Sequence, residues 1–278
     1  MRQSTLTDQV VVITGANGGF GQALATALAA KGARLALIAR KPDVAKSLAA
    51  ALGGDDRAAG FAADVQSLEQ LEETMHAIRL HFGRIDVVVA NAGIDIVKPV
   101  EHQTEDEFAR LIDINLTGVW RTYKAAIPFM RRGGYLLTVS SMAAFVHSPL
   151  QGAYVASKAG VLAMGNSLRL ELRGRGIKVG SVHPTFFDTP LMDEVKADPA
   201  GRALWGGNSS GLWRMVPIDQ VVDQTVRAIE RRKQMVVVPG RLRAVAAAPS
   251  AWKHVVGRIG FTDRGIAHAI RLAGAVEK

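Results

Sequence analysis

Short apolar runs alternate along this chain with longer segments in which apolar residues recur at helical spacing. The short runs are nearly continuous Val, Ile, Leu and Ala, as expected of parallel strands whose two faces are both covered. The expected strands are residues 9–13, 33–39, 60–65, 85–90, 135–139, 177–182 and 235–238. This alternation predicts an α/β fold: a single-domain, Rossmann-like, doubly wound parallel sheet with helices on both faces.

The helical segments between these strands define the rest of the predicted organisation. The expected helices are residues 22–31, 42–52, 67–82, 104–130, 152–173 and 218–232. Thr104 and Glu107 have the spacing of a capping box, so the fourth helix, a long one, is expected to begin there. Residues 191–216 are irregular and contain Trp and Met, which favours a lid over a site. We therefore expect a Rossmann domain at residues 1–239 and a C-terminal extension at residues 240–278.

The basic charge of the protein is concentrated in this extension. The formal net charge is +9, and residues 231–278, which comprise the extension and the nine residues before it, hold ten Lys or Arg and two Asp or Glu, a local balance of +8. The extension could be solvated, pack in an oligomer, contact anionic lipid headgroups, or attract an anionic thioester substrate. Trp252 and Phe261 are its only stacking residues and it has no nucleic-acid-binding motif, so no nucleic acid partner is expected.

Composition excludes several other classes of site. The chain contains no Cys, which rules out a disulfide framework, a thiolate metal site and a Cys nucleophile. No His, Asp and Glu cluster has the spacing of a metal site, so no metal is expected.

The longest uncharged runs, residues 9–30 and 133–157, are interrupted by glycine or polar residues and are not expected to span a membrane. Since no signal peptide is evident, we expect a cytoplasmic protein, with peripheral membrane contact through the extension left open.

A glycine-rich turn follows the first strand. Residues 14–21 read Thr-Gly-Ala-Asn-Gly-Gly-Phe-Gly and lead into a helix. Glycines let the backbone turn tightly and approach a pyrophosphate, whose charge is met by the amide groups at the helix N-terminus. In this strand–turn–helix context the turn predicts a dinucleotide-binding site, with a simple tight connection as the alternative.

The end of the second strand indicates which dinucleotide is bound. This strand ends in Ala39, followed by Arg40 and Lys41. A carboxylate at this place would bind the ribose 2′-hydroxyl and repel a 2′-phosphate, whereas cations favour the phosphate. The sequence therefore favours NADP(H) over NAD(H), and a solvated Arg-Lys pair is the alternative.

Tyr154 and Lys158 are spaced to lie on one face at the start of a predicted helix. A phenol with a pKa near ~10 is a poor base at neutral pH, but a nearby ammonium favours the phenolate and lowers that pKa. Such a pair can exchange a proton with an alcohol or ketone oxygen. The alternative is a partly buried Tyr beside a solvated Lys.

Several motifs occur together and in a fixed order in this chain. An Asn-Ala-Gly tripeptide at 91–93 follows the fourth strand, and Ser141 precedes Tyr154 by thirteen residues. Together with the glycine turn and the Tyr-x-x-x-Lys pair, these motifs resemble the short-chain dehydrogenase/reductase family in its single-domain branch, over about residues 8–190. The resemblance implies an oxidoreductase that interconverts a secondary alcohol and a ketone.

The resemblance also implies roles for individual residues. Tyr154 would be the catalytic acid–base group, and Lys158 would lower its pKa and bind the nicotinamide ribose. Ser141 would hydrogen-bond the substrate oxygen, and Asn115 would support a proton-relay water. The residues expected to bind the cofactor are Gly15, Asn17, Gly19, Phe20, Gly21, Arg40, Lys41, Asp64, Val65, Asn91, Ala92, Gly93, Tyr154, Lys158, Pro184 and Thr189.

The chain departs from the family pattern after the sixth strand, where Thr185 rather than Gly follows Pro184. The bulky residues expected to contact a small-molecule substrate are Phe186, Phe187, Met192, Trp205 and Trp213. They favour a bulky, apolar, lipid- or steroid-like substrate. The resemblance further implies a homotetramer or homodimer formed through the helices at 104–130 and 152–173. The alternative interpretation of the chain is a non-catalytic NADP(H)-binding sensor or interaction module.

Overall fold

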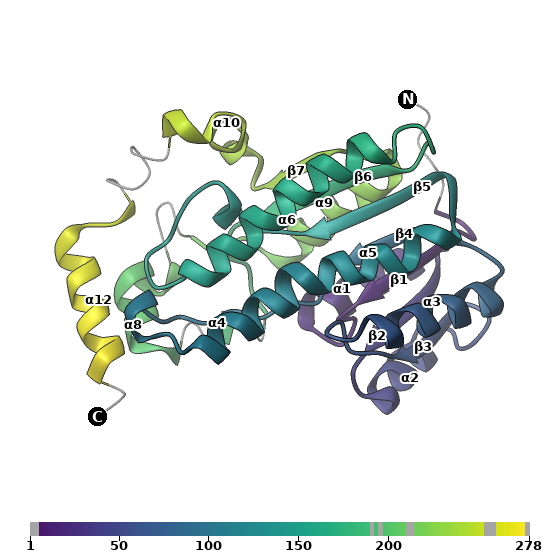
Figure 1. Cartoon of the computed structure of the whole chain (residues 1–278), viewed down its shortest axis with the longest axis horizontal. Coiled ribbons are helices and arrows are strands. Elements are labelled where there is room, and N and C mark those ends of the chain that lie inside the picture. Colours follow the sequence, from purple (N-terminus) through teal and green to yellow (C-terminus); the bar gives the residue numbers. More distant parts are fainter. Residues whose placement is uncertain (1–5, 190–191, 194–196, 210–213, 253–259, 276–278) are drawn as a thin grey trace.

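Seven parallel strands form one sheet in the order β3-β2-β1-β4-β5-β6-β7 (Figure 1). The computed structural model describes residues 6–189, 192–193, 197–209, 214–252 and 260–275. The strands are β1 (Val10–Thr14), β2 (Arg34–Ala39), β3 (Ala58–Ala62), β4 (Ile85–Ala90), β5 (Met130–Val139), β6 (Lys178–Pro184) and β7 (Met235–Val238). The strand order reverses at β1, which pairs with both β2 and β4, so the carboxyl ends of β1 and β4 flank a topological switch point.

Helices cover both faces of this sheet, which confirms the predicted fold class. On one face lie α1 (Gly19–Ala30), α2 (Pro42–Ala51) and α9 (Ile218–Arg231); on the other lie α3 (Leu68–Phe82), α5 (Gly118–Ala126) and α6 (Gly152–Glu171). Successive side chains of β1 divide between the two layers: Val11 and Ile13 pack in the first, and Val10 and Val12 in the second. All four are fully buried, which explains why β1 is apolar along its whole length.

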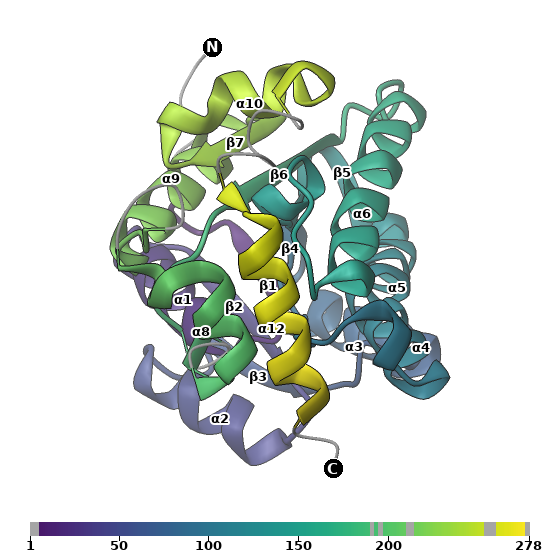
Figure 2. The same cartoon turned by 90° about the vertical axis from the view of Figure 1, so that its left-hand side faces the viewer.

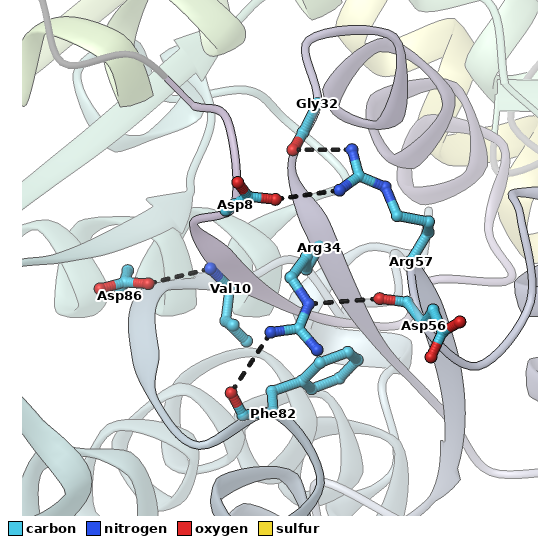
Figure 3. Close-up of polar contacts among 8 residues, drawn as sticks. All are labelled: Asp8, Val10, Gly32, Arg34, Asp56, Arg57, Phe82 and Asp86. Atoms are coloured by element: carbon cyan, nitrogen blue, oxygen red, sulfur yellow. Dashed lines mark hydrogen bonds and ion pairs between the residues drawn. The ribbon is translucent and has the colours of Figure 1, made fainter.

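Hydrogen bonds from polar side chains join the amino ends of neighbouring strands (Figure 3). Asp86 at the start of β4 accepts a hydrogen bond from the backbone N–H of Val10 at 2.9 Å. Arg57 donates to Asp8 at 3.0 Å and to the carbonyl oxygen of Gly32 at 3.1 Å, which joins the starts of β1, β2 and β3. These contacts hold the amino ends of the strands together. A binding site is therefore expected at the carboxyl ends of the strands.

The helix predicted at residues 104–130 begins as expected, but it is divided into several helical segments. Thr104 and Glu107 form both hydrogen bonds of a capping box at the start of α4 (Glu105–Ile112). A π-helical turn at Asp113–Thr117 then separates α4 from α5. A 3₁₀ turn containing proline, Ile127–Phe129, ends the helical stretch because proline has no N–H to donate, and β5 begins directly after it.

The segment predicted to be irregular at residues 191–216 contains a helix, α8 (Pro199–Trp205). The side chain of Asp198 caps it by accepting a hydrogen bond from the N–H of Gly201 at 2.8 Å. The extension also has helices in its described part, α10 (Arg243–Ala247) and α12 (Asp263–Ala275), and α12 packs beside α8 (Figure 2). Among the described residues, no helix is long and apolar enough to cross a membrane.

Candidate active site

One cavity of about 400 Å³ lies at the carboxyl ends of the strands, at the switch point between β1 and β4. It is lined by the loops that follow β1, β2, β4, β5 and β6, together with residues of α6, α8 and α10. The sequence-predicted residues that line it are Gly15, Asn17, Gly19, Phe20, Gly21, Arg40, Asp64, Val65, Asn91, Ala92, Gly93, Ser141, Tyr154, Lys158, Pro184, Phe186, Phe187, Thr189, Met192 and Trp205.

Among the described residues, two predicted site residues are not on the wall of this cavity. Lys41 is exposed and lies at the start of α2, outside the cavity lining. Asn115 is buried behind the lining. Trp213 lies outside the described residues. The structure therefore gathers most of the predicted residues in one place, and Lys41 is not among them.

The glycine turn has the shape of an anion cradle. Gly15 has a φ of +62°, and a Cβ there would lie 2.8 Å from the Cα of Ala92. A Cβ on Gly21 would lie 2.5 Å from the carbonyl oxygen of Gly15. Gly18, the residue before α1, provides no side-chain cap, and the first turn of α1 carries no acidic residue. The amide groups at this helix start are thus positioned to bind a pyrophosphate, and the turn fits a dinucleotide.

Asn91 joins the glycine turn to the end of β4. Its side-chain amide donates to the carbonyl oxygens of Thr14 and Gly15, both at 3.0 Å. Its own backbone N–H donates to Thr14 Oγ1 at 3.1 Å. These bonds join residues about 77 positions apart in sequence and hold the glycine turn after β1 against the end of β4. Asn91 therefore shapes the part of the cavity into which the cofactor would fit.

Arg40 and Asp64 line the cavity at the ends of β2 and β3, on the far side of the glycine turn from Tyr154. Arg40 is exposed, so its guanidinium is available to a phosphate group. Asp64 is held in place, because its carboxylate accepts from the N–H of Gln66 at 3.0 Å and its own N–H donates to Gln70 Oε1 at 2.9 Å.

The proton-transfer residues lie at the other end of the cavity. Tyr154 and Lys158 are one turn apart on α6, and the Lys158 ammonium lies 5.3 Å from the centre of the Tyr154 ring. Lys158 Nζ also donates to the carbonyl oxygen of Val139, at the end of β5, at 3.2 Å. Ser141 follows β5, and its side chain hydrogen-bonds Tyr154. A carbonyl oxygen placed between Ser141 and Tyr154 would meet two hydroxyl groups.

Burial decides the protonation of this pair. It raises the pKa of Tyr154, the negative charge of Asp95 raises it further, and the Ser141 hydrogen bond only partly opposes this. Burial lowers the pKa of Lys158 to about 8, against the effect of Asp95. In this structure the pKa of Tyr154 is therefore raised and not lowered, and the loss of hydration on burial is the largest cause. The Tyr154 phenol stays protonated at neutral pH.

Asn115 lies in the π-helical turn and holds the loop after β4. Its side chain donates to the carbonyl oxygen of Ile94 and accepts from the N–H of the same residue, both at 2.8 Å. It also donates to Ser157 Oγ on α6 at 3.3 Å. The wider π turn brings this side chain inward at a position that a continuous α-helix would have aimed differently. Asn115 thereby couples the β4 loop to the helix that carries Tyr154.

Sequence reasoning missed several residues of the cavity. Asp95 and Gln151 line it next to Tyr154, and Leu242 and Val245 bring the C-terminal extension to its wall. Asp95 had a detectable signal, because polar residues after parallel strands collect at the binding edge of the sheet. Leu242 and Val245 had none, since their approach depends on how the extension folds back.

Two buried polar atoms of the cavity lining have no hydrogen-bond partner within the described parts of the chain: Thr185 Oγ1 and Trp205 Nε1. Such groups cost free energy unless a ligand or water satisfies them. They therefore mark the cavity as a binding site. No group of three or more His, Asp or Glu side chains suited to a metal ion occurs in the described residues.

Comparisons with known proteins cover most of the chain and indicate one protein family. Residues 9–200 match the family described as short chain dehydrogenase. The D-threitol dehydrogenase of Mycolicibacterium smegmatis is 37% identical over 202 residues, 72% of this chain and 78% of that protein. The 3beta-hydroxysteroid dehydrogenase 1 of Eggerthella lenta is 34% identical over 203 residues, 71% of this chain and 78% of that protein. A crystal structure of a short chain dehydrogenase/reductase from Burkholderia phymatum in complex with NAD shares the fold, with a TM-score of 0.78, 22% identity, and coverage of 92% of this chain and 96% of that chain.

Proposed function

This chain belongs to the short-chain dehydrogenase/reductase family, whose members are NAD(P)-dependent oxidoreductases acting on CH–OH or C=O groups, and from this premise we propose that it transfers a hydride between NADP(H) and a secondary alcohol or ketone. The observation that carries the proposal is the meeting of Ser141, Tyr154 and Lys158 with the glycine cradle in one cavity. The competing function, a non-catalytic NADP(H) sensor, would not require Ser141, Tyr154 and Lys158 to lie together.

In reduction, the chain's own residues supply the proton and hold the substrate. When bound, NADP(H) supplies or accepts the hydride. Tyr154 is protonated at neutral pH and donates its phenolic proton to the carbonyl oxygen, while Ser141 donates a hydrogen bond to the same oxygen. The Lys158 ammonium stabilises the phenolate that remains. In oxidation the same proton moves back, so Tyr154 is the general acid–base group, a role worth typically ~10²–10⁴-fold in rate.

The preference for NADP(H) rests on Arg40. It is an exposed cation on the cavity wall at the end of β2, where Ala39 provides no carboxylate to bind a ribose hydroxyl. Lys41 does not line the cavity, so we assign the 2′-phosphate to Arg40 alone. The fold neighbour from Burkholderia phymatum was solved with NAD, so the preference must come from this chain's own residues.

The substrate side of the cavity supports an apolar substrate body. Its apolar lining includes Met142, Val146, Phe186, Leu242 and Val245. The two relatives described above are named for a small polyol and for a steroid, so their names do not choose between small and bulky substrates. The lining favours a bulky, apolar ketone or alcohol. Within the segment predicted as a lid, the described helix α8 brings Trp205 to the cavity wall.

The C-terminal extension is proposed to complete the substrate site. Val245 is buried against Met142 and Phe145, and Phe261 is buried in the cluster that contains Trp205. The described part of the extension therefore packs against the Rossmann domain of residues 1–239, which favours a structural role over a membrane contact. Pelleting with anionic vesicles, with and without residues 240–278, tests the membrane alternative: equal, negligible pelleting of both forms would dispose of it.

A homo-oligomer is proposed from the exposed face of the helices. Phe108 on α4, Trp120 on α5 and Leu170 on α6 are 43%, 44% and 68% exposed in the single chain. Large apolar side chains exposed on successive helices are candidates for burial between subunits. A dimer or tetramer formed through these helices would cover them. Analytical ultracentrifugation of the full chain tests this, and a monomer at micromolar concentration would contradict it.

A further inference from the structure

A carboxylic acid lies inside the cavity that the chemistry above does not use. Asp95 follows β4 and lines the same cavity as Ser141, Tyr154 and Lys158. It is close enough to the last two for its charge to affect both of their pKa values. Asp95 therefore lies beside the place where the reacting oxygen would bind.

Asp95 is held in a fixed orientation by two neutral donors. The N–H of Ile96 donates to its Oδ1 at 2.8 Å, and the side-chain amide of Gln151 donates to its Oδ2. Gln151 is buried and lies directly before α6, three residues ahead of Tyr154. A hydrogen bond from Lys98 N–H to the Leu150 carbonyl oxygen, at 2.7 Å, joins the same two loops. The carboxyl group is thus positioned relative to Tyr154 through Gln151.

This arrangement is unfavourable as a purely structural contact. A carboxylate removed from water needs strong compensation, and here neither direct partner carries a charge. The consequence is a pKa raised to about 6, with burial as the main cause. An Asn would make similar bonds to Ile96 and Gln151 without that cost. Ionisable groups kept under such conditions in a cavity are candidates for function.

The chemistry of the group indicates what it binds. A carboxylate offers roughly four acceptor positions, and two are used by Ile96 and Gln151. Because Asp95 faces the cavity, the others can accept from a bound molecule. A substrate ammonium is disfavoured, since the positive charge of Lys158 already acts on Asp95. A neutral donor, a hydroxyl group, remains as the fitting partner.

We propose that Asp95 is a specificity-determining residue that accepts a hydrogen bond from a second hydroxyl group of the substrate, close to the reacting carbon. The substrate is then a diol, or the corresponding hydroxy ketone, whose apolar body lies toward Leu242 and Val245. This inference rests on the proposed function, because it presupposes that the cavity oxidises an alcohol or reduces a ketone.

The test compares three alcohols of one ring size with the full chain and NADP⁺: cyclohexanol, trans-cyclohexane-1,2-diol and cyclohexane-1,3-diol. We expect kcat/KM for one of the diols to exceed that for cyclohexanol by tenfold or more, the range expected of a hydrogen bond to a charged acceptor. In Asp95→Asn the ratio of kcat/KM for that diol to kcat/KM for cyclohexanol should fall to within about threefold of unity. The reason is that the amide group replaces acceptor positions by a donor. Asp95→Leu should abolish the preference. NADP⁺ binding should be unchanged in both variants.

Glu101→Gln is the matched control, because Glu101 is an exposed carboxylate in the loop before α4 and lies outside the cavity lining. It should keep the wild-type ratio. If the wild type oxidises cyclohexanol, and the ratio of kcat/KM for the diol to kcat/KM for cyclohexanol is the same in the wild type and in Asp95→Asn, this inference alone is overturned. A preference of the wild type for cyclohexanol, or for trans-2-aminocyclohexanol over the diols, would also overturn it. If the wild type binds NADP⁺ but oxidises no alcohol and reduces no ketone, the proposed function fails, and this inference with it.

Discussion

The ammonium of Lys158 lies 5.3 Å from the centre of the Tyr154 ring, one helical turn further along α6. The same ammonium donates to the carbonyl oxygen of Val139 at the end of β5. Helix and sheet therefore fix the position of the charge relative to the phenol. Burial nevertheless keeps the phenol protonated, so the pair is arranged to give a proton to a substrate oxygen and to stabilise the phenolate left behind.

Cofactor preference should depend on Arg40 and not on its neighbour. Replacing Arg40 by Ala removes a charge-assisted contact to the 2′-phosphate, so the Kd for NADPH should rise about 10- to 100-fold and the Kd for NADH by less than about twofold. Lys41→Ala is the matched control and should leave both values nearly unchanged, because Lys41 does not line the cavity. Fluorescence titration measures both. Equal losses in the two variants, or tighter NADH binding by the wild type, would refute the assignment.

The extension should influence substrate binding and not cofactor binding. Leu242→Ala removes three carbon atoms from a half-buried side chain on the cavity wall, so KM for a bulky apolar ketone should rise roughly tenfold, less than full burial of the three would give. KM for NADPH should stay the same. Arg241→Ala, an exposed neighbour that does not line the cavity, is the control. If both variants behave alike in steady-state kinetics, the extension is not a wall of the substrate site.

Asp95 should also make stability depend on pH. Its folded-state pKa is raised from 3.8 to about 6, so its contribution to stability is full below pH 4 and is lost as the pH rises through 6. Between pH 5 and pH 7.5 the wild type should lose roughly 1 to 1.5 kcal/mol of unfolding free energy relative to Asp95→Asn. Urea unfolding of both proteins at the two pH values measures this. A constant difference between them would mean that Asp95 is charged throughout.

Local sequence signals predicted much of the fold and part of the site. The glycine turn, the capping box at Thr104 and the spacing of Tyr154 and Lys158 each depend on a few consecutive residues, and the structure shows each geometry. The helix predicted at 104–130 differs in its continuity, because the π turn and the 3₁₀ turn that contains Pro128 divide it.

Contacts between distant parts of the chain could not be predicted in this way. Gln151 and Asp95 are 56 positions apart, and only the folded loops show that one holds the other. The approach of Leu242 and Val245 to the cavity depends on the extension folding back over the carboxyl ends of the strands. The pKa of Tyr154 was misjudged for a related reason: the sequence shows the neighbouring Lys158, but the loss of hydration appears only when the cavity is formed.

The most direct test of the account is the substitution Tyr154→Phe, with Tyr135→Phe as its control. Both remove one phenolic hydroxyl; that of Tyr135 is buried away from the cavity and donates to the carbonyl oxygen of Lys233 at 2.6 Å. NADPH binding and NADPH-dependent ketone reduction should be measured on the same preparations. We expect Tyr154→Phe to bind NADPH as the wild type does and to lose turnover by ~10²–10⁴-fold, while Tyr135→Phe keeps turnover at some cost in stability. Wild-type turnover by Tyr154→Phe would contradict the central claim that this phenol transfers the proton.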